Sequence, residues 1–388
     1  MVRSPKKAEE NEPREVSRAR LELAAFGSTR AVTNGQLTKS EVWWSLHFEW
    51  LKSRGYLLRP RYAPGWVPSW IGTKRNMFLC EDGRSSKLAT TLLDATRISD
   101  GAYVVLKIIK VSDHPHEVEI GRMFSAAPLS TDPANHCVSI YDVIPVDEDQ
   151  DKVIIVMPLL ARYISPPLCT IGEAVECFRQ LFEGLQFMHR NRVAHRDCMT
   201  MNIMMDPSKL YVDPFHPVHP LMKRDFSGYA RFKTRTQCPV KYYFIDFGLS
   251  RWYDPSISNP LEVPIWGGDK EVPEFQNNNE PRDPFPTDVF YIGNAIRKDF
   301  VEPNHGLQFM GPIIADMVQE DPSKRPTIDE VVTRFEIIRK SLGPWKLRSR
   351  LADKQENMLE NAILTVSHWT RQLRYVAKHL PAVPLPPS

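Results

Sequence analysis

The stretch AHRDCMTMNIMM, residues 194 to 205, places four polar side chains among methionines and small residues: His195, Arg196, Asp197 and Asn202. A buried core strand would not carry these polar groups, and a solvated loop would not carry the methionines. The mixture indicates a catalytic loop whose polar groups project into a site. The unbranched methionines then fill the irregular space between the loop and a core.

Other polar residues interrupt apolar runs on either side of this loop. Lys107 ends the strand-like run YVVLK, and Glu119 lies in HEVEIGRMF. Asp246 follows the apolar YYFI and begins the tripeptide Asp-Phe-Gly. A single buried Asp or Lys is more often half of a structural ion pair than a catalytic group. The prediction of chemistry therefore depends on the joint order and spacing of these residues.

In that order and spacing the chain resembles eukaryotic protein kinases, from roughly residue 79 to residue 340. H-R-D-x-x-x-x-N and D-F-G are followed by VPE with Glu274, which resembles the end of a kinase activation segment. Asp288 in DVFYIG resembles the start of the next helix, and Arg325 stands where kinases keep the arginine that pairs with that glutamate. The resemblance implies an α+β, two-lobed protein kinase fold, with a β-rich N-lobe and a helical C-lobe.

The resemblance also implies roles in the transfer of a γ-phosphate from ATP. Lys107 would hold the α- and β-phosphates, and Glu119 would hold Lys107. Asp197 would orient the acceptor hydroxyl and accept its proton. Asp246 and Asn202 would bind Mg²⁺ through oxygen atoms, the ligands that this hard cation prefers. ATP and magnesium are therefore the expected cofactors.

An adenine site is expected in VIIVMPLLARY. By the same resemblance Met157 is the gatekeeper, followed by a hinge of Pro158, Leu159 and Leu160. Kinase hinges use the carbonyl of the first hinge residue and the amide of the third. Proline lacks only an amide that this scheme does not use. The hinge is therefore compatible with nucleotide binding.

Two departures concern ATP binding. No G-x-G-x-x-G precedes Lys107, and Gly83 stands alone near the expected place. Because glycines let backbone amides approach phosphates closely, the segment GRSSKLA should cradle them less well. Glu119 lies only 12 residues after Lys107. Glu117 competes for the same role, and Glu119 is preferred because Met123, one turn later, would face the core.

A third departure concerns the acceptor. Serine/threonine kinases place a lysine two residues after the catalytic aspartate, and here that position is Met199. Gly267 occupies the place of a threonine that contacts the catalytic loop in such kinases. The choice between Ser/Thr and Tyr acceptors therefore stays open, with Ser/Thr favoured.

The elements that must position these residues follow from the pattern along the chain. Ser40 could cap a helix that carries Trp43, Trp44, Phe48 and Leu51. The aromatic residues of this segment either pack on the main domain or form a ligand cage. Runs 77–83, 88–97, 102–110 and 152–160 resemble antiparallel strands. Capping boxes predict helices beginning at Thr170 and Thr327, the first with an apolar face of Val175, Phe178, Leu181, Phe182, Leu185 and Met188. We expect a disordered arm with some helix (1–38), a Trp-rich extension (39–78), the N-lobe and hinge (79–160), the C-lobe (161–345) and a C-terminal helix with a Pro-rich tail (346–388).

The expected C-lobe carries a long insertion, residues 206–243. Its mixture of Lys, Arg, Phe and Tyr could bind acidic or nucleic-acid partners. A surface insertion packed on the helical lobe is the favoured alternative. The histidine pairs 114/116 and 216/219 lack nearby cysteines, so no metal site is expected there. The extension, the insertion and the motifs together resemble divergent protein kinase-like proteins of mushroom-forming fungi.

Composition limits the remaining classes. The formal charge of +3 is too small to indicate nucleic-acid binding. The six scattered cysteines form no CxxC pair, as expected of reduced thiols in the cytoplasm or nucleus. The N-terminus has no apolar signal core, and no apolar run is long enough to cross a membrane. We expect a monomer.

These observations favour a protein kinase that transfers phosphate to a protein hydroxyl. Arg196 would receive a negative charge from the activation segment, His195 would pack near Phe247, and Ser256 and Ser258 are candidate phosphorylation sites. A pseudokinase scaffold without turnover is the main alternative, because the glycines are missing. A small-molecule kinase of related fold is a weaker one.

Overall fold

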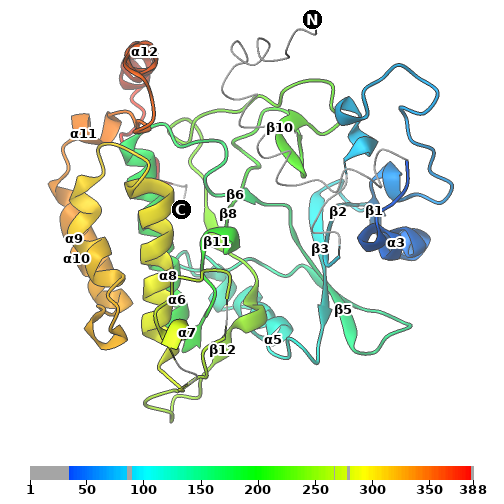
Figure 1. Cartoon of the computed structure of the whole chain (residues 1–388), viewed down its shortest axis with the longest axis horizontal. Coiled ribbons are helices and arrows are strands. Elements are labelled where there is room, and N and C mark those ends of the chain that lie inside the picture. The colour runs from blue at the N-terminus through cyan, green and yellow to red at the C-terminus, as the bar shows by residue number, and fades with distance from the viewer. Residues whose placement is uncertain (1–34, 85–89, 266, 278–279, 386–388) are drawn as a thin grey trace, which may run out of the picture. The chain divides into compact units, whose positions relative to one another are not determined.

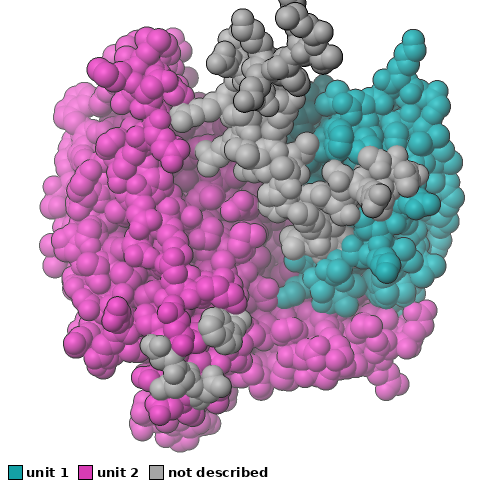
Figure 2. All heavy atoms as spheres, in the orientation of Figure 1, with its two compact units in different colours: residues 1–108, 213–231 teal, residues 109–212, 232–388 magenta. Residues whose placement is uncertain are grey.

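The computed structural model describes residues 35–84, 90–265, 267–277 and 280–385. Most of the expected N-terminal arm lies outside these described residues. Residues 85–89 of the segment GRSSKLA also lie outside them. The described chain divides into two compact units, coloured separately in Figure 2. Unit 1 comprises residues up to 108 together with 213–231, and unit 2 comprises 109–212 and 232–388. The domain boundaries expected from the sequence stay a prediction.

Unit 1 is built around three antiparallel strands in the order β1-β2-β3. Lys107 of β3 lies opposite Leu92 of β2. The helices and strands of this unit are α3 (Lys39–Leu46), α4 (Phe48–Ser53), β1 (Tyr56–Leu58), β2 (Leu92–Arg97), β3 (Tyr103–Lys110, ending in unit 2), β9 (Phe215–His216) and β10 (His219–Lys223).

Two expectations for the elements between residues 38 and 83 change. The first helix is capped by Thr38 rather than Ser40, because Thr38 forms a capping box with Glu41. Residues 77–83 form two 3₁₀ turns and not a strand, since the Asn76 side chain accepts a hydrogen bond from the Phe78 N–H (3.0 Å) and closes the first turn. The aromatic residues mainly pack, with Trp44 and Trp70 buried.

The insertion divides between the two units. Its hairpin β9–β10 belongs to unit 1, where His216 is fully buried and lies 3.3 Å from a guanidinium nitrogen of Arg59. Residues 232–243 belong to unit 2, where Arg235 donates to the carbonyls of Tyr163 and Pro166. The expectation of packing on the helical part is therefore right for the second piece and wrong for the first.

Unit 2 is mainly helical (Figure 1). Helix α6 packs against α8, α10 and α11. The strands form the antiparallel pairs β4–β5 and β12–β7 and the sheet β11-β8-β6. The helices are α5 (Glu117–Ser125), α6 (Ile171–Arg190), α7 (Glu274–Asn277), α8 (Pro284–Ile296), a π-helical turn (Arg297–Val301), α9 (Gly311–Met317), α10 (Ile328–Ser341), α11 (Pro344–Arg348) and α12 (Met358–Ala377). The strands are β4 (Asp142–Pro145), β5 (Lys152–Pro158), β6 (Ala161–Arg162), β7 (Val193–Ala194), β8 (Ile203–Met205), β11 (Tyr242–Phe244) and β12 (Arg251–Trp252).

Helix α6 begins where expected, and all six residues of its predicted apolar face are buried. The Thr170 hydroxyl accepts from the Glu173 N–H at 3.0 Å, but the Glu173 carboxylate accepts the Cys169 N–H at 2.6 Å, so the predicted capping box is only half formed. Thr327 and Glu330 form the predicted capping box of α10. With antiparallel strands in the N-terminal part and helices in the C-terminal part, the chain has the α+β fold of a two-lobed protein kinase. No helix in the described parts of the chain is long and apolar enough to cross a membrane.

Candidate active site

The loop 195–202 connects β7 to β8, and α8 holds its backbone. The Asp288 carboxylate accepts the backbone N–H groups of His195 and Arg196, each at 2.7 Å, and also contacts His189 Nε2 at 3.0 Å. Arg196 has a φ of 67°. Because this left-handed backbone conformation is uncommon outside glycine, the bonds to the buried Asp288 explain how the loop maintains it.

Both carboxylate oxygens of Asp197 are held. The Asn202 side-chain nitrogen donates to Asp197 Oδ2 at 2.9 Å and to the Asp197 carbonyl at 2.8 Å. The Gly268 N–H donates to Asp197 Oδ1 at 2.9 Å. Burial raises the pKa of the Asp197 carboxyl, and the nearby charge of Asp246 raises it further.

Asp246 follows β11 in a left-handed conformation with φ 66°. Its Oδ1 accepts the Gly248 N–H at 3.3 Å. Phe247 is buried, and its ring centroid lies 5.5 Å from that of His195, as expected. The structure therefore brings Asp197, Asn202 and Asp246 together in unit 2.

The two candidate glutamates occupy different faces of α5. The Glu119 side chain is 78% exposed and lies 3.6 Å from His116. Glu117 is 1% exposed, on the face shared with Ile120 and Phe124. Met123, expected to face the core one turn after Glu119, is only half-buried. Burial thus favours Glu117 over Glu119 as a carboxylate for the site.

The remaining predicted residues lie on strands and at their ends. Lys107 is half-buried on β3 and belongs to unit 1. Met157 is buried at the end of β5 in unit 2, followed by the half-buried Pro158 and Leu160. Gly83 does not resemble a phosphate-loop glycine, because a Cβ there would lie 2.1 Å from the Met77 carbonyl oxygen.

Two ion pairs anchor the activation segment, residues 246–274. Glu274 pairs with Arg325 through two hydrogen bonds of 2.6 and 2.7 Å, as the motifs predict. Arg196 lies 3.3 Å from Glu262, which supplies the negative charge expected from this segment.

Gly268 also contacts Met199, the residue in place of the usual lysine. A Cβ on Gly268 would lie 2.0 Å from the Met199 sulfur, so the thioether packs directly against this glycine. Gly267 is the residue singled out in the sequence, for the threonine that it replaces, whereas the contact to Asp197 comes from the N–H of Gly268. The Gly-Gly pair seven and six residues before Glu274 is the signal that could have indicated a backbone contact here.

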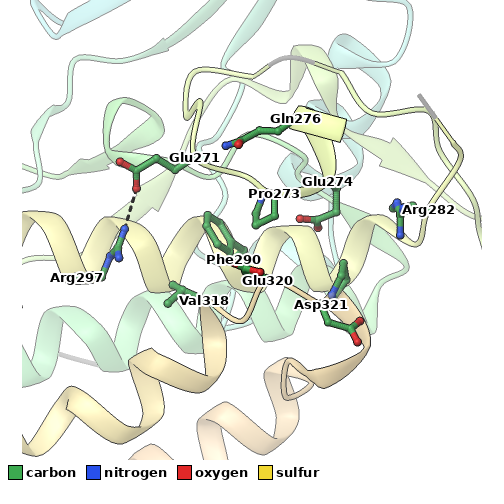
Figure 3. A pocket seen from close by; sticks show the side chains of 11 residues that line it. Glu271, Pro273, Glu274, Gln276, Arg282, Phe290, Arg297, Val318, Glu320 and Asp321 are labelled. Atoms are coloured by element: carbon green, nitrogen blue, oxygen red, sulfur yellow. Dashed lines mark hydrogen bonds and ion pairs between the residues drawn. The ribbon is translucent and has the colours of Figure 1, made fainter. Parts of the chain in front are cut away.

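A pocket of about 630 Å³ lies beside the end of the activation segment (Figure 3). Pro273, Glu274, Phe290 and Val318 are among the residues that line it, and the Glu271–Arg297 ion pair (2.8 Å) lies at its edge. Asp197, Asn202 and Asp246 do not line this pocket. It is therefore separate from the predicted site.

Among the described residues, no group of three or more His, Cys, Asp or Glu side chains could hold a metal ion alone. Mg²⁺ does not require such a group, because it binds one or two protein ligands together with water and phosphate oxygens. Asp246 and the side-chain oxygen of Asn202 fit that requirement, since the Asn202 nitrogen already donates to Asp197.

No protein-family model matches the chain. It is similar to NUAK family SNF1-like kinase 1 of Homo sapiens, with 24% identity over 67% of this chain and 37% of the relative. It is also similar to serine/threonine-protein kinase PLK1 of Xenopus laevis, with 24% identity over 66% of this chain and 41% of the relative. NUAK family SNF1-like kinase 2 of Rattus norvegicus is 31% identical over 29% of the chain and 18% of the relative. The chain thus spans well under half of the length of these relatives. With the motif order and the fold, these similarities make the chain a divergent protein kinase-like protein.

Proposed function

We propose that the chain is an ATP- and Mg²⁺-dependent protein kinase that phosphorylates serine or threonine hydroxyls. The observation that carries the proposal is the grouping of Asp197 and Asn202, on a loop anchored by Asp288, with Asp246, which follows β11. Phosphoryl transfer asks the protein mainly for positioning and charge neutralisation, and two neighbouring carboxylates with an amide oxygen suit a divalent cation.

Each residue then has a defined task. Asp197 orients the acceptor hydroxyl and takes its proton, and its raised pKa suits a proton acceptor. Asp246 and Asn202 would hold Mg²⁺, which neutralises phosphate charge when bound. Lys107 would bind the α- and β-phosphates, and burial favours Glu117 over Glu119 as the acid that α5 would contribute. Met157, Pro158 and Leu160 would line the adenine site.

The Gly268 N–H is a positioning group in this scheme. It holds Asp197 Oδ1 where serine/threonine kinases use side chains around the catalytic aspartate. Gly268→Ala would push against Met199 and lower transfer by about 10- to 100-fold, because small displacements of a catalytic group are costly. The double variant Gly268→Ala/Met199→Ala should recover part of the loss.

The direct test is transfer of label from radioactive ATP to a generic substrate or to the chain itself. Asp197→Asn should lower the rate by about 100-fold or more while an ATP–Mg²⁺ thermal shift persists. Lys107→Met should lower both rate and shift, and Lys110→Met, at an exposed position on the same strand, should change neither. Full activity in Asp197→Asn contradicts the proposed proton acceptor.

A nucleotide- or partner-binding scaffold without turnover is the second candidate. The packing of Gly83 against the Met77 carbonyl favours it, since this glycine cannot approach phosphates freely. An ATP–Mg²⁺ thermal shift without label transfer supports the scaffold that binds nucleotide. No shift at millimolar ATP supports the partner-binding form.

A further inference from the structure

Helix α12, Met358–Ala377, is docked on unit 2 by one face. His368, Gln372 and Tyr375 are buried on that face. His368 Nε2 lies 2.8 Å from the Arg348 carbonyl oxygen, and the Tyr375 hydroxyl lies 3.1 Å from that of Thr234. These contacts fix which side of the helix faces away from unit 2.

The opposite side is apolar and exposed. Leu359, Val366 and Leu373 follow one another at intervals of seven residues and are 73%, 68% and 60% exposed. Ile363, 61% exposed, extends the same stripe. At 100° per residue, this stripe lies directly opposite His368. Contiguous apolar surface of this kind is rare on a monomer and marks an interaction site.

The sequence of the stripe is that of a short coiled-coil seam. If Leu359, Val366 and Leu373 are d positions, the a positions between them are Ile363 and Thr370, and Glu360 and Arg374 are e positions beside the seam. A seam of this type is complementary to a second copy of itself, as in an isologous two-fold interface. We propose that α12 pairs in the antiparallel direction with α12 of a second copy of this chain, which makes the protein a homodimer.

The charges beside the stripe favour the antiparallel direction. The half-buried Glu360 and the exposed Arg374 lie on the same edge of the stripe, 14 residues apart, which is about 21 Å along the helix. An antiparallel two-fold axis places Glu360 of each copy opposite Arg374 of the other. A parallel axis would set the two Glu360 side chains at the same level, without an opposite charge.

The interface is small, so the dimer forms only as concentration rises. A helix of 20 residues is about 30 Å long and offers fewer than three heptads. Trp345, which is 63% exposed and whose ring centroid lies 6.1 Å from that of Trp369, can extend the contact. Contacts of this size give weak association.

The test is sedimentation equilibrium of the full chain between about 1 and 100 µM, which covers weak dimers. The average mass should rise from monomer toward dimer across this range. Val366→Glu/Leu373→Glu should stay monomeric with an unchanged circular dichroism spectrum. Ile337→Glu, at a 67% exposed position on α10 outside the stripe, should dimerise like the parent.

The direction of pairing is tested by exchanging charges. Glu360→Arg and Arg374→Glu should each weaken the dimer about tenfold, and the double variant should restore it. Weakening without restoration overturns the antiparallel arrangement.

A constant monomer mass overturns the dimer itself. So does a monomer that binds vesicles of phosphatidylcholine and phosphatidylserine through Val366, because the stripe would then contact lipid. These outcomes are independent of phosphoryl transfer.

Discussion

Two buried ionic arrangements, the Glu274–Arg325 pair of unit 2 and the cluster around Asp94 of unit 1, differ in kind. In unit 2, a single acid pairs with a single base. Glu274 and Arg325, with side chains 2% and 0% exposed, form two hydrogen bonds with each other. In unit 1, one acid is shared: Asp94 accepts Arg59 at 3.0 Å and Arg224 at 2.8 Å. Arg59 comes from the Trp-rich extension and Arg224 from the insertion. The pair in unit 2 therefore follows the kinase pattern, while the cluster in unit 1 ties two additions to that pattern onto strand β2.

Removing the base from the simple pair should have the largest effect on stability. Arg325→Met should lower the free energy of unfolding by about 3–5 kcal/mol, because Glu274 is left buried without its partner. Urea unfolding followed by circular dichroism measures the change. Arg334→Met, which removes a half-exposed pair with Asp316, is the control and should stay within about 1 kcal/mol. Equal effects of the two variants would contradict the assigned role of burial.

Removing the shared acid should be somewhat less harmful. Asp94→Ala should cost about 3 kcal/mol, because Arg59 keeps Glu81 at 2.9 Å and the Arg224 side chain is 16% exposed. Since Asp94 holds the hairpin β9–β10, limited proteolysis should also cut within 213–231 faster than in the parent.

Asp100→Ala is the matched control for this variant. It removes an exposed pair with Arg97 at the end of the same strand and should change neither stability nor cleavage. If residues 213–231 resist protease in Asp94→Ala as they do in the parent, the insertion does not depend on the cluster.

The difference between the units also explains what could be predicted. The fold, the Glu274–Arg325 pair and the loop around Asp197 follow from motifs whose chemistry fixes residue type and spacing. The cluster at Asp94 joins segments more than 100 residues apart, and no local pattern links them. Glu117 and Glu119 lie two residues apart on one short helix, so only the packing of α5, and no local sequence signal, shows that Glu117 is the buried one.

Acid should weaken unit 1 specifically. Burial lowers the pKa of His216 to about 4, with Arg59 adding to the shift and Glu81 and Asp94 opposing it. The unfolded chain takes up a proton near pH 6.5 while the folded chain does not, so stability is complete above about pH 6.5 and falls toward pH 4. We expect a loss of roughly 2–3 kcal/mol from this group.

Unfolding free energies measured at several pH values test this expectation. His216→Gln should flatten the slope between pH 6.5 and 4, whatever its effect at pH 7. The pKa of His219 is lowered to about 3, mainly by burial and then by Arg84, so His219→Gln should remove a second part of the slope. A slope that is the same in the parent and in both single variants would exclude the histidines as its cause.

The smallest expected effect comes from the second pair of the activation segment. Arg196 lies 3.3 Å from Glu262, whose side chain is 26% exposed, and it also donates to the carbonyls of Leu249 and Val263. Glu262→Gln retains the shape of the side chain and removes its charge, so the free energy of unfolding should fall by only about 1 kcal/mol.

The Glu262 carboxylate already gives Arg196 the charge that phosphorylation of Ser256 or Ser258 would otherwise supply. Unphosphorylated parent should therefore transfer phosphate without a lag, Glu262→Gln should transfer several-fold more slowly, and Glu280→Gln, at an exposed acid, should match the parent. A parent that becomes active only after phosphorylation would show that the Arg196–Glu262 pair does not order this segment.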